Sequence, residues 1–251
     1  MPETSERPLA GRYALVTGAT RGIGQATALA LAEAGAHVIA IGRTSGALEE
    51  LDDAIAELGS TATLVPLDLK DFPAIDRLGG AIYERFGRLD IFVGNAGVLG
   101  PMTPLAQVEP KEWDDALSVN LTANWRLMRS LDPLLRLSTA GRAVLVSSGA
   151  AHKARAFWGT YAITKAGLEV LARTWAAEVA NISNLRVNLI NPGPTRTRMR
   201  AKAFPSEDPD TLPAPEDIAA AIVGLCLPAF EETGKLYDFP TARLVEFRLP
   251  A

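Results

Sequence analysis

The chain has 251 residues, of which 48% are hydrophobic and 22% are charged, a composition typical of a globular protein with a core of ordinary size. Its formal net charge is −4 and both signs are scattered along the chain, which argues against a nucleic-acid-binding protein and favours a small-molecule partner. Cys226 is the only cysteine, which excludes a disulfide framework and a cysteine-based metal site, so we expect no metal and a reducing compartment.

The N-terminal stretch, MPETSERP, is polar and lacks the apolar region of a signal peptide. No apolar run reaches the roughly 18 residues that a membrane span needs. We therefore expect a cytoplasmic protein that does not bind membranes.

Short apolar runs alternate with segments of helical periodicity along the whole chain. The runs predict strands at Tyr13–Thr17, His37–Ile41, Ala62–Leu67, Leu89–Val93, Ala143–Ser147 and Leu185–Ile190. The periodic segments predict helices at Gly24–Ala34, Ala47–Leu58, Pro73–Phe86, Glu112–Leu137 and Tyr161–Ala180. This alternation predicts one α/β domain over residues 1–251, with a doubly wound, Rossmann-type parallel sheet of about seven strands and helices on both faces. Residues 194–215 are long, polar and proline-rich, which predicts a loop or a substrate lid.

The first predicted strand runs into a glycine turn, V-T-G-A-T-R-G-I-G-Q, that opens the first helix. Such a turn places backbone N–H groups and a helix N-terminus where an anion can bind, although an ordinary turn between strand and helix is the alternative. The glycines Gly18, Gly22 and Gly24 have the spacing G-x-x-x-G-x-G, which differs from the common dinucleotide fingerprint G-x-G-x-x-G.

The second predicted strand ends in A-I-G-R-T, Ala40 to Thr44. Folds that bind NAD commonly carry an acidic residue there, whereas an arginine accommodates the 2′-phosphate of NADP. Here Gly42 replaces the acid and Arg43 follows it, so Arg43 and Arg21 could bind a phosphate between them. The alternative is that both arginines are solvated surface residues.

The last predicted helix begins with Y-A-I-T-K, and Tyr161 and Lys165 share one helical face because they are four residues apart. A nearby ammonium favours the phenolate, which makes Tyr161 a candidate general acid and base. The same spacing is common by chance on amphipathic helices.

Taken together, these motifs resemble the compact form of the short-chain dehydrogenase/reductase family over about residues 10–237. T-G-A-T-R-G-I-G is similar to that family's T-G-x-x-x-G-x-G turn, Y-A-I-T-K to its Y-x-x-x-K motif, V-S-S-G to its serine motif and S-V-N-L to its asparagine motif. Ser148 precedes Tyr161 by 13 positions, the family's spacing, which selects Ser148 over Ser147.

The resemblance implies a role for each matching residue. Tyr161 would exchange a proton with a substrate carbonyl as hydride is transferred, and Ser148 would hold the carbonyl oxygen. Lys165 would lower the pKa of Tyr161 and bind the nicotinamide ribose, while Asn120 would support a water that links Lys165 to solvent. The expected cofactor is NADP(H), and the expected substrate is a small carbonyl or alcohol.

The resemblance also implies the cofactor contacts. They are Gly18, Thr20, Arg21, Gly22, Ile23, Gly24, Arg43, Thr44, Asp68, Leu69, Asn95, Ala96, Gly97, Pro192, Gly193, Thr195 and Thr197. For Asp68 a strand-end cap is an equal alternative, and the Pro192-Gly193 stretch is open to interpretation as a simple turn.

Two departures from the family pattern bear on the structure. Gly94 stands where the family usually has the first asparagine of N-N-A-G, and we expect it to leave the cofactor wall open and to loosen the end of its strand. The segment Thr233–Asp238 lacks the family's D-G-G ending, on which a tetramer contact is usually built. We therefore expect a homodimer and a homotetramer equally.

The substrate side is the least determined part of the sequence. Its expected lining is Leu99, Met102, His152, Phe157, Trp158 and Phe204. Arg196, Arg198, Arg200 and Lys202 would either select an anionic substrate or form a solvated face. The sequence predicts a carbonyl reductase, with a 3-oxoacyl thioester or a xenobiotic or sugar ketone as open choices of substrate. A non-catalytic NADP-binding regulator on the same fold remains the alternative, and a methyltransferase is disfavoured by Arg43 and the Tyr-Lys pair.

Overall fold

A computed structural model describes residues 7–247, in which eight strands form one sheet in the order β3-β2-β1-β4-β5-β6-β7-β8. The strands are β1 (Tyr13–Thr17), β2 (His37–Gly42), β3 (Ala62–Pro66), β4 (Ile91–Gly94), β5 (Arg142–Val146), β6 (Arg186–Asn191), β7 (Leu236–Asp238) and β8 (Arg243–Val245). All neighbouring strands run parallel except β7 and β8, which are antiparallel.

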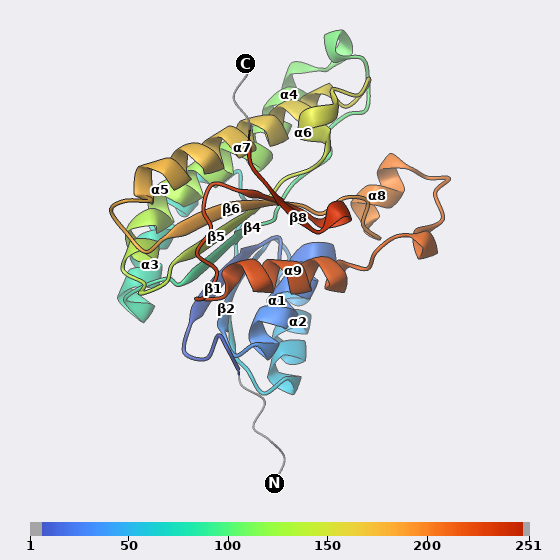
Figure 1. Ribbon diagram of the computed structural model, residues 1–251. Helices are drawn as coiled ribbons and strands as arrows, with labels where there is room; N and C mark the ends of the chain where they lie inside the picture. The colour runs from blue at the N-terminus through green and yellow to red at the C-terminus, as the bar shows by residue number, and fades with distance from the viewer. Residues whose placement is uncertain (1–6, 248–251) are drawn as a thin grey trace.

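Helices cover both faces of the sheet (Figure 1). One face carries α3 (Phe72–Phe86), α5 (Ala123–Arg136) and α7 (Gly159–Val179), and the other carries α1 (Gly22–Glu33), α2 (Ser45–Glu57) and α9 (Pro215–Cys226). Each layer has its own apolar core, because the central strands are buried on both sides and send alternate side chains to the two faces. The predicted doubly wound α/β fold is confirmed.

The structure adds a strand to the predicted sheet and corrects one predicted helix. The sheet has eight strands rather than about seven, since the C-terminal segment adds β7 and the exposed β8, which are each too short for a periodic signal. The helix predicted at Glu112–Leu137 is α4 (Pro110–Leu117) and α5, separated by a π-helical turn, η2 (Ser118–Thr122). A π turn holds one extra residue, and such turns often occur at functional sites.

The expectation that Gly94 loosens β4 was also wrong. Gly94 is buried and pairs in register with Leu145 of β5. A Cβ at this position would lie 2.4 Å from the Leu145 side chain and 2.8 Å from Oδ1 of Asn124 on α5. Glycine therefore allows α5 to pack closely against the end of the strand.

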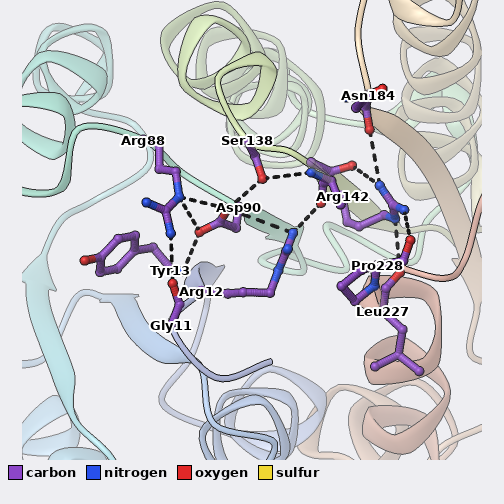
Figure 2. A network of polar contacts seen from close by, with 12 residues as sticks. Gly11, Arg12, Tyr13, Arg88, Asp90, Ser138, Arg142, Asn184, Leu227 and Pro228 are labelled. Atoms are coloured by element: carbon purple, nitrogen blue, oxygen red, sulfur yellow. Dashed lines mark hydrogen bonds and ion pairs between the residues drawn. The ribbon is translucent and has the colours of Figure 1, made fainter. Parts of the chain in front are cut away.

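The N-terminal ends of the strands are joined by a buried polar network centred on Asp90 (Figure 2). The Asp90 carboxylate accepts hydrogen bonds from Ser138 Oγ at 2.6 Å, from the Tyr13 backbone N–H at 2.9 Å and from Arg88 Nε at 3.2 Å. Beside it, Arg142 donates to four backbone carbonyls, those of Gly141, Asn184, Leu227 and Pro228. The network thus connects the C-terminal end of α9 to the N-terminal ends of the strands.

The remaining helices lie near the other end of the strands or in the loops. They are α6 (Ala150–Lys153), α8 (Arg198–Ala203) and the short 3₁₀ turns η1 (Leu105–Gln107), η3 (Pro209–Thr211) and η4 (Phe239–Thr241). Figure 1 shows α8 and the loop after it projecting beyond the body of the molecule. Within residues 7–247 no helix has the length and apolarity to cross a membrane.

Candidate active site

Most of the predicted site residues follow six strands whose ends the topology brings to one edge of the sheet. The loops that follow β1 to β6 all leave from the carboxyl ends of parallel strands. The strand order reverses between β1 and β4, and ligands of such sheets bind in the crevice at this reversal.

Tyr161 and Ser148 meet at this edge. Tyr161 lies in the first turn of α7 and is 8% exposed, while Ser148 follows the C-terminal end of β5. Burial raises the pKa of Tyr161, and a hydrogen bond with the Ser148 side chain acts in the opposite direction. The two hydroxyls are therefore close enough to bind the same carbonyl oxygen.

Lys165 lies one helical turn after Tyr161 and is 3% exposed. Its Nζ donates to the backbone carbonyl of Val146 at 2.7 Å and lies 5.7 Å from the centre of the Tyr161 ring. Burial lowers the pKa of Lys165 to about 8, and the negative charge of Glu169 opposes that shift. Burial sets the direction of the Tyr161 pKa shift, and the Lys165 charge, which was expected to lower that pKa, is not among its causes.

Asn120 lies in the π-helical turn and is fully buried. Its Oδ1 accepts from the Val98 N–H at 2.8 Å, and its Nδ2 donates to the Val98 carbonyl at 2.8 Å and to Thr164 Oγ1 at 3.0 Å. Its own backbone carbonyl accepts from Asn124 Nδ2 at 2.9 Å. The amide thus connects the loop after β4 to helix α7, between Tyr161 and Lys165.

The glycine turn is closed against the loop after β4. Asn95 Nδ2 donates to the Thr17 carbonyl at 2.9 Å, and Thr17 Oγ1 accepts from the N–H groups of Asn95 and Ala96. Gly18 has a φ of +65°, and a Cβ on Gly24 would lie 2.2 Å from the Gly18 carbonyl oxygen. These contacts require glycine at both positions.

The turn is open to an anion where helix α1 begins. Arg21 is the N-cap, its side chain caps no N–H of the first turn, and that turn holds no acidic residue. The half-buried Ile23 packs against the core behind the turn. The backbone N–H groups at this end therefore face a space that suits a phosphate.

The end of β2 also fits a 2′-phosphate. Gly42 is buried, and a Cβ there would lie 2.6 Å from the Thr20 methyl group, so an aspartate would require Thr20 to move. Arg21 and Arg43 are both exposed, and their side chains make no hydrogen bond or ion pair among residues 7–247. Thr44, the N-cap of α2, likewise makes no capping hydrogen bond with its side chain. Two unpaired guanidinium groups thus stand beside a strand end that lacks a carboxylate.

The loop after β6 is held next to the glycine turn. Gly193 has a φ of +67°, and a Cβ there would lie 2.5 Å from Pro240. Thr195 is buried, with its hydroxyl 3.3 Å from the Pro192 carbonyl oxygen. Thr197 caps α8, accepting from the Arg200 N–H at 3.2 Å, and its methyl group is the nearest side chain to a Cβ built on Gly22.

The remaining predicted cofactor contacts have unequal surroundings. A Cβ on Gly97 would lie 3.3 Å from Asn120 Oδ1 and 3.6 Å from Lys165 Nζ, so glycine keeps the space in front of Lys165 open. Leu69 is buried, whereas Asp68 is exposed and its Oδ1 accepts from the Lys70 N–H at 2.9 Å. That bond is the local turn of the alternative interpretation of Asp68.

The side facing Tyr161 carries several of the predicted substrate residues. The Trp158 ring lies 6.1 Å from the Tyr161 ring, edge to face, and 5.6 Å from the Phe204 ring of the predicted lid. Met102 and Phe157 are exposed, and Leu99 is buried. These aromatic contacts connect residues 194–215 to the start of α7.

Only part of the basic run in that segment is available to a ligand. Arg200 makes two hydrogen bonds to the Glu207 carboxylate, at 2.5 and 2.6 Å, and Arg196 lies 3.3 Å from Asp210. Arg198 and Lys202 are exposed and form no ion pair within residues 7–247. Residues 7–247 contain no cluster of three metal-ligating side chains.

Sequence reasoning missed three polar residues around the site. Glu169 is a buried carboxylate bonded to Ser147 and His152, so His152 faces that carboxylate. Asn191 Oδ1 accepts from the N–H groups of Gly149 and Gly193. The third is Asn124, which sits under Gly94. Of these three residues, only Glu169 could have been found from the sequence, because it lies four residues after Lys165 on the same helical face.

A model of the short chain dehydrogenase family matches residues 12–208 of the chain. The chain belongs to the short-chain dehydrogenase family. Its relatives include YciK of Escherichia coli, described as an uncharacterised oxidoreductase, which is 41% identical over 210 residues covering 82% of each chain. An uncharacterised NAD-dependent oxidoreductase of Mycobacterium tuberculosis is 36% identical over 205 residues, covering 76% of this chain and 74% of its own.

Solved structures agree with this assignment. A short chain dehydrogenase of Shigella flexneri in complex with NADP matches with a TM-score of 0.89 and 38% identity, covering 94% of this chain and 99% of its own. Our chain is thus an oxidoreductase of the short-chain dehydrogenase family, and its relatives include both an NADP complex and a protein described as NAD-dependent.

Proposed function

We propose that this short-chain dehydrogenase uses NADP(H) to reduce a small ketone, or to oxidise the corresponding alcohol, with Tyr161 as the general acid and base. The observation that carries the proposal is the joint placement of Tyr161, Ser148 and Lys165 at the strand edge beside a glycine turn without carboxylates. The dinucleotide would supply or accept the hydride when bound.

The chain's own residues would handle the proton and the orientation. The Ser148 and Tyr161 hydroxyls bind the carbonyl oxygen, and Tyr161 donates its proton to that oxygen as negative charge develops on it. The Lys165 ammonium, close to the Tyr161 ring, then stabilises the phenolate until a proton returns. Asn120 holds the loop after β4 against α7, so that Lys165 stays in place.

The cofactor preference follows from charge. Among the described residues the Arg21 and Arg43 side chains have no partner, and the Gly42 position has no room for an acidic side chain in this packing. A 2′-phosphate would therefore meet two guanidinium groups and no carboxylate, which favours NADP(H) over NAD(H). The remaining predicted contacts, from Thr20 to Thr197, would surround the rest of the dinucleotide, and residues 194–215 would act as a lid.

The substrate side favours a ketone with an apolar group. The Trp158 ring lies between those of Tyr161 and Phe204, at 6.1 and 5.6 Å. The loop after β4 adds the exposed side chains of Met102 and Leu105, and the segment before α7 adds Phe157. A 3-oxoacyl thioester is the second candidate, because Arg198 and Lys202, which form no ion pair in the described part of the chain, suit the phosphate of its carrier.

The test is NADPH oxidation measured with aryl ketones, aliphatic ketones and 3-oxoacyl thioesters, each repeated with NADH. We expect turnover with at least one class and a preference for NADPH. Tight NADPH binding without turnover of any substrate, in either direction, would instead support a non-catalytic NADP-binding regulator. Equal affinity for NADH and NADPH would contradict the cofactor assignment.

A further inference from the structure

A buried carboxylate lies behind the proposed catalytic residues. Glu169 is 4% exposed and follows Tyr161 and Lys165 at intervals of four residues along one face of α7. A buried carboxylate is costly unless it is hydrogen-bonded or paired with a charge. The groups that bind the Glu169 carboxylate therefore indicate its role in the structure.

Two side chains bind the Glu169 carboxylate. Ser147 Oγ donates to Oε1 at 2.5 Å, and His152 Nε2 lies 3.1 Å from Oε1 and 3.0 Å from Oε2. Ser147 is buried, and its N–H donates to the Ile190 carbonyl of β6 at 2.8 Å. One carboxylate thus connects the end of β5, helix α6 and helix α7.

Both contacts flank Ser148. Ser147 precedes Ser148, and α6, which carries His152, begins two residues after it. The Ala150 N–H at the start of α6 donates to Ser148 Oγ at 3.2 Å. Glu169 therefore holds the chain on either side of the hydroxyl that bonds to Tyr161.

The charge of Glu169 acts on a different residue, Lys165, which lies one helical turn earlier on α7. Within residues 7–247 Lys165 forms no direct ion pair, and it donates to the Val146 carbonyl. The negative charge of Glu169 raises the pKa of Lys165 against the effect of burial. Two further charged side chains lie on the elements that contact Glu169. Arg173 is four residues after it on α7, with its guanidinium 4.2 Å from the Phe247 ring centre, and the exposed Lys153 follows His152 on α6.

We propose that Glu169 is the positioning residue of this active site. Its hydrogen bonds to Ser147 and His152 hold Ser148 at Tyr161, and its charge is the buried counter-ion of Lys165. The inference rests on the proposed function for its effect on turnover, but its effect on Lys165 is a property of the protein without cofactor.

Two substitutions at Glu169 separate the two roles. Glu169→Gln keeps the side-chain shape and an oxygen for Ser147 but removes the charge. Glu169→Leu removes both, and Ser147→Ala removes one hydrogen bond but leaves the charge. Glu178→Gln, at an exposed position of the same helix, is the matched control. Circular dichroism and thermal melting of every variant identify those that fold.

The first readout is the Lys165 titration in the protein without cofactor, followed by NMR of ¹³Cε-labelled lysine and assigned with Lys165→Met. We expect Glu169→Gln to lower the Lys165 pKa by about one unit, since an opposite charge at close range shifts a pKa by roughly 1–3 units. Ser147→Ala and Glu178→Gln should leave it unchanged. An unchanged Lys165 pKa in Glu169→Gln overturns the counter-ion role.

The second readout is the pH profile of kcat for ketone reduction. Glu169→Gln should move the alkaline limb to lower pH by the same amount. Ser147→Ala should lower kcat about tenfold at every pH without moving the limb, because it displaces Ser148 but keeps the charge. Wild-type kcat in Ser147→Ala overturns the Ser148 role.

The two readouts also distinguish this inference from the proposed function. If the wild-type protein reduces no carbonyl compound, the proposed function fails, and the lysine titration still decides whether Glu169 is the counter-ion. For Ser148, the readout without turnover is the Tyr161 pKa, measured by the ultraviolet difference signal lost in Tyr161→Phe. Since the Ser148 hydrogen bond lowers that pKa, Ser147→Ala should raise it, and an unchanged value overturns the positioning role.

Discussion

Buried charges occur at both ends of the sheet, and the two ends use different residues. At the N-terminal ends of the strands, Asp90 binds Arg88, Ser138 and the Tyr13 N–H, and Arg142 donates to four carbonyls (Figure 2). At the carboxyl ends the buried groups are Tyr161, Lys165 and Glu169.

The difference lies in whether the buried groups can change charge. Burial lowers the pKa of Arg142 to about 10, so it stays protonated at neutral pH, and its donors are satisfied by carbonyl groups. The Lys165 pKa, by contrast, is about 8, close enough to neutrality for proton exchange. Fixed, satisfied charges suit a structural role, whereas a group that titrates close to neutral pH suits the proton transfer that we propose for the carboxyl ends of the strands.

The largest effect is expected from a substitution that acts only at the carboxyl ends of the strands. Tyr161→Phe removes the proton donor but keeps the ring, so kcat should fall about 1000-fold with little change in the free energy of unfolding. NADPH oxidation and urea denaturation measure the two quantities. Full activity in this variant would refute the proposed mechanism.

The second largest effect is expected from a substitution that acts only at the N-terminal ends of the strands. Asp90→Ala leaves Arg88 and the partly buried Arg12 without their carboxylate, so we expect a loss of about 3 kcal/mol in the free energy of unfolding. NADPH affinity of the folded protein should not change. A stability loss below 1 kcal/mol would show that the network is not what holds this end together.

A third comparison uses arginines from the two ends. Arg43→Ala should weaken NADPH binding by about 2 kcal/mol, roughly thirtyfold, and leave NADH binding and stability unchanged. Arg142→Met should lower the free energy of unfolding and leave the binding of both dinucleotides unchanged, because the Arg142 guanidinium donates to backbone carbonyls. Isothermal titration with both dinucleotides and urea denaturation test the pair, and equal weakening of NADH and NADPH would contradict a phosphate contact.

The smallest effect is a pH dependence of stability. Lys165 titrates at about 8 when folded and near 10.5 when unfolded, so the unfolded chain binds more protons between these values. The free energy of unfolding should therefore rise with pH across this window, by about 1–2 kcal/mol between pH 8 and 10, relative to Lys165→Met. Chemical denaturation of both proteins at the two pH values measures it, and parallel curves would place the folded pKa near 10.5.

The fold and the family were predictable because their signals are local. Buried parallel strands are continuous apolar runs, and β1 was predicted with the bounds that the structure shows. The break between α4 and α5 was not predictable, because the π turn depends on Asn120 bonding to Val98 and Thr164, which lie in other segments. Short edge strands such as β8 likewise depend on the strand they pair with.

By itself, the sequence determined the α/β alternation, the glycine turn, the Tyr-Lys spacing and the lack of an acid after the second strand, since each depends on residues close together in the chain. Only the tertiary structure showed that Lys165 is buried against the Val146 carbonyl and that glycine is needed at position 94, where Asn124 packs against β4. It also showed that Glu169 joins the two chain segments around Ser148. Burial and charge act across distances in space, so they are decided only when distant segments pack together.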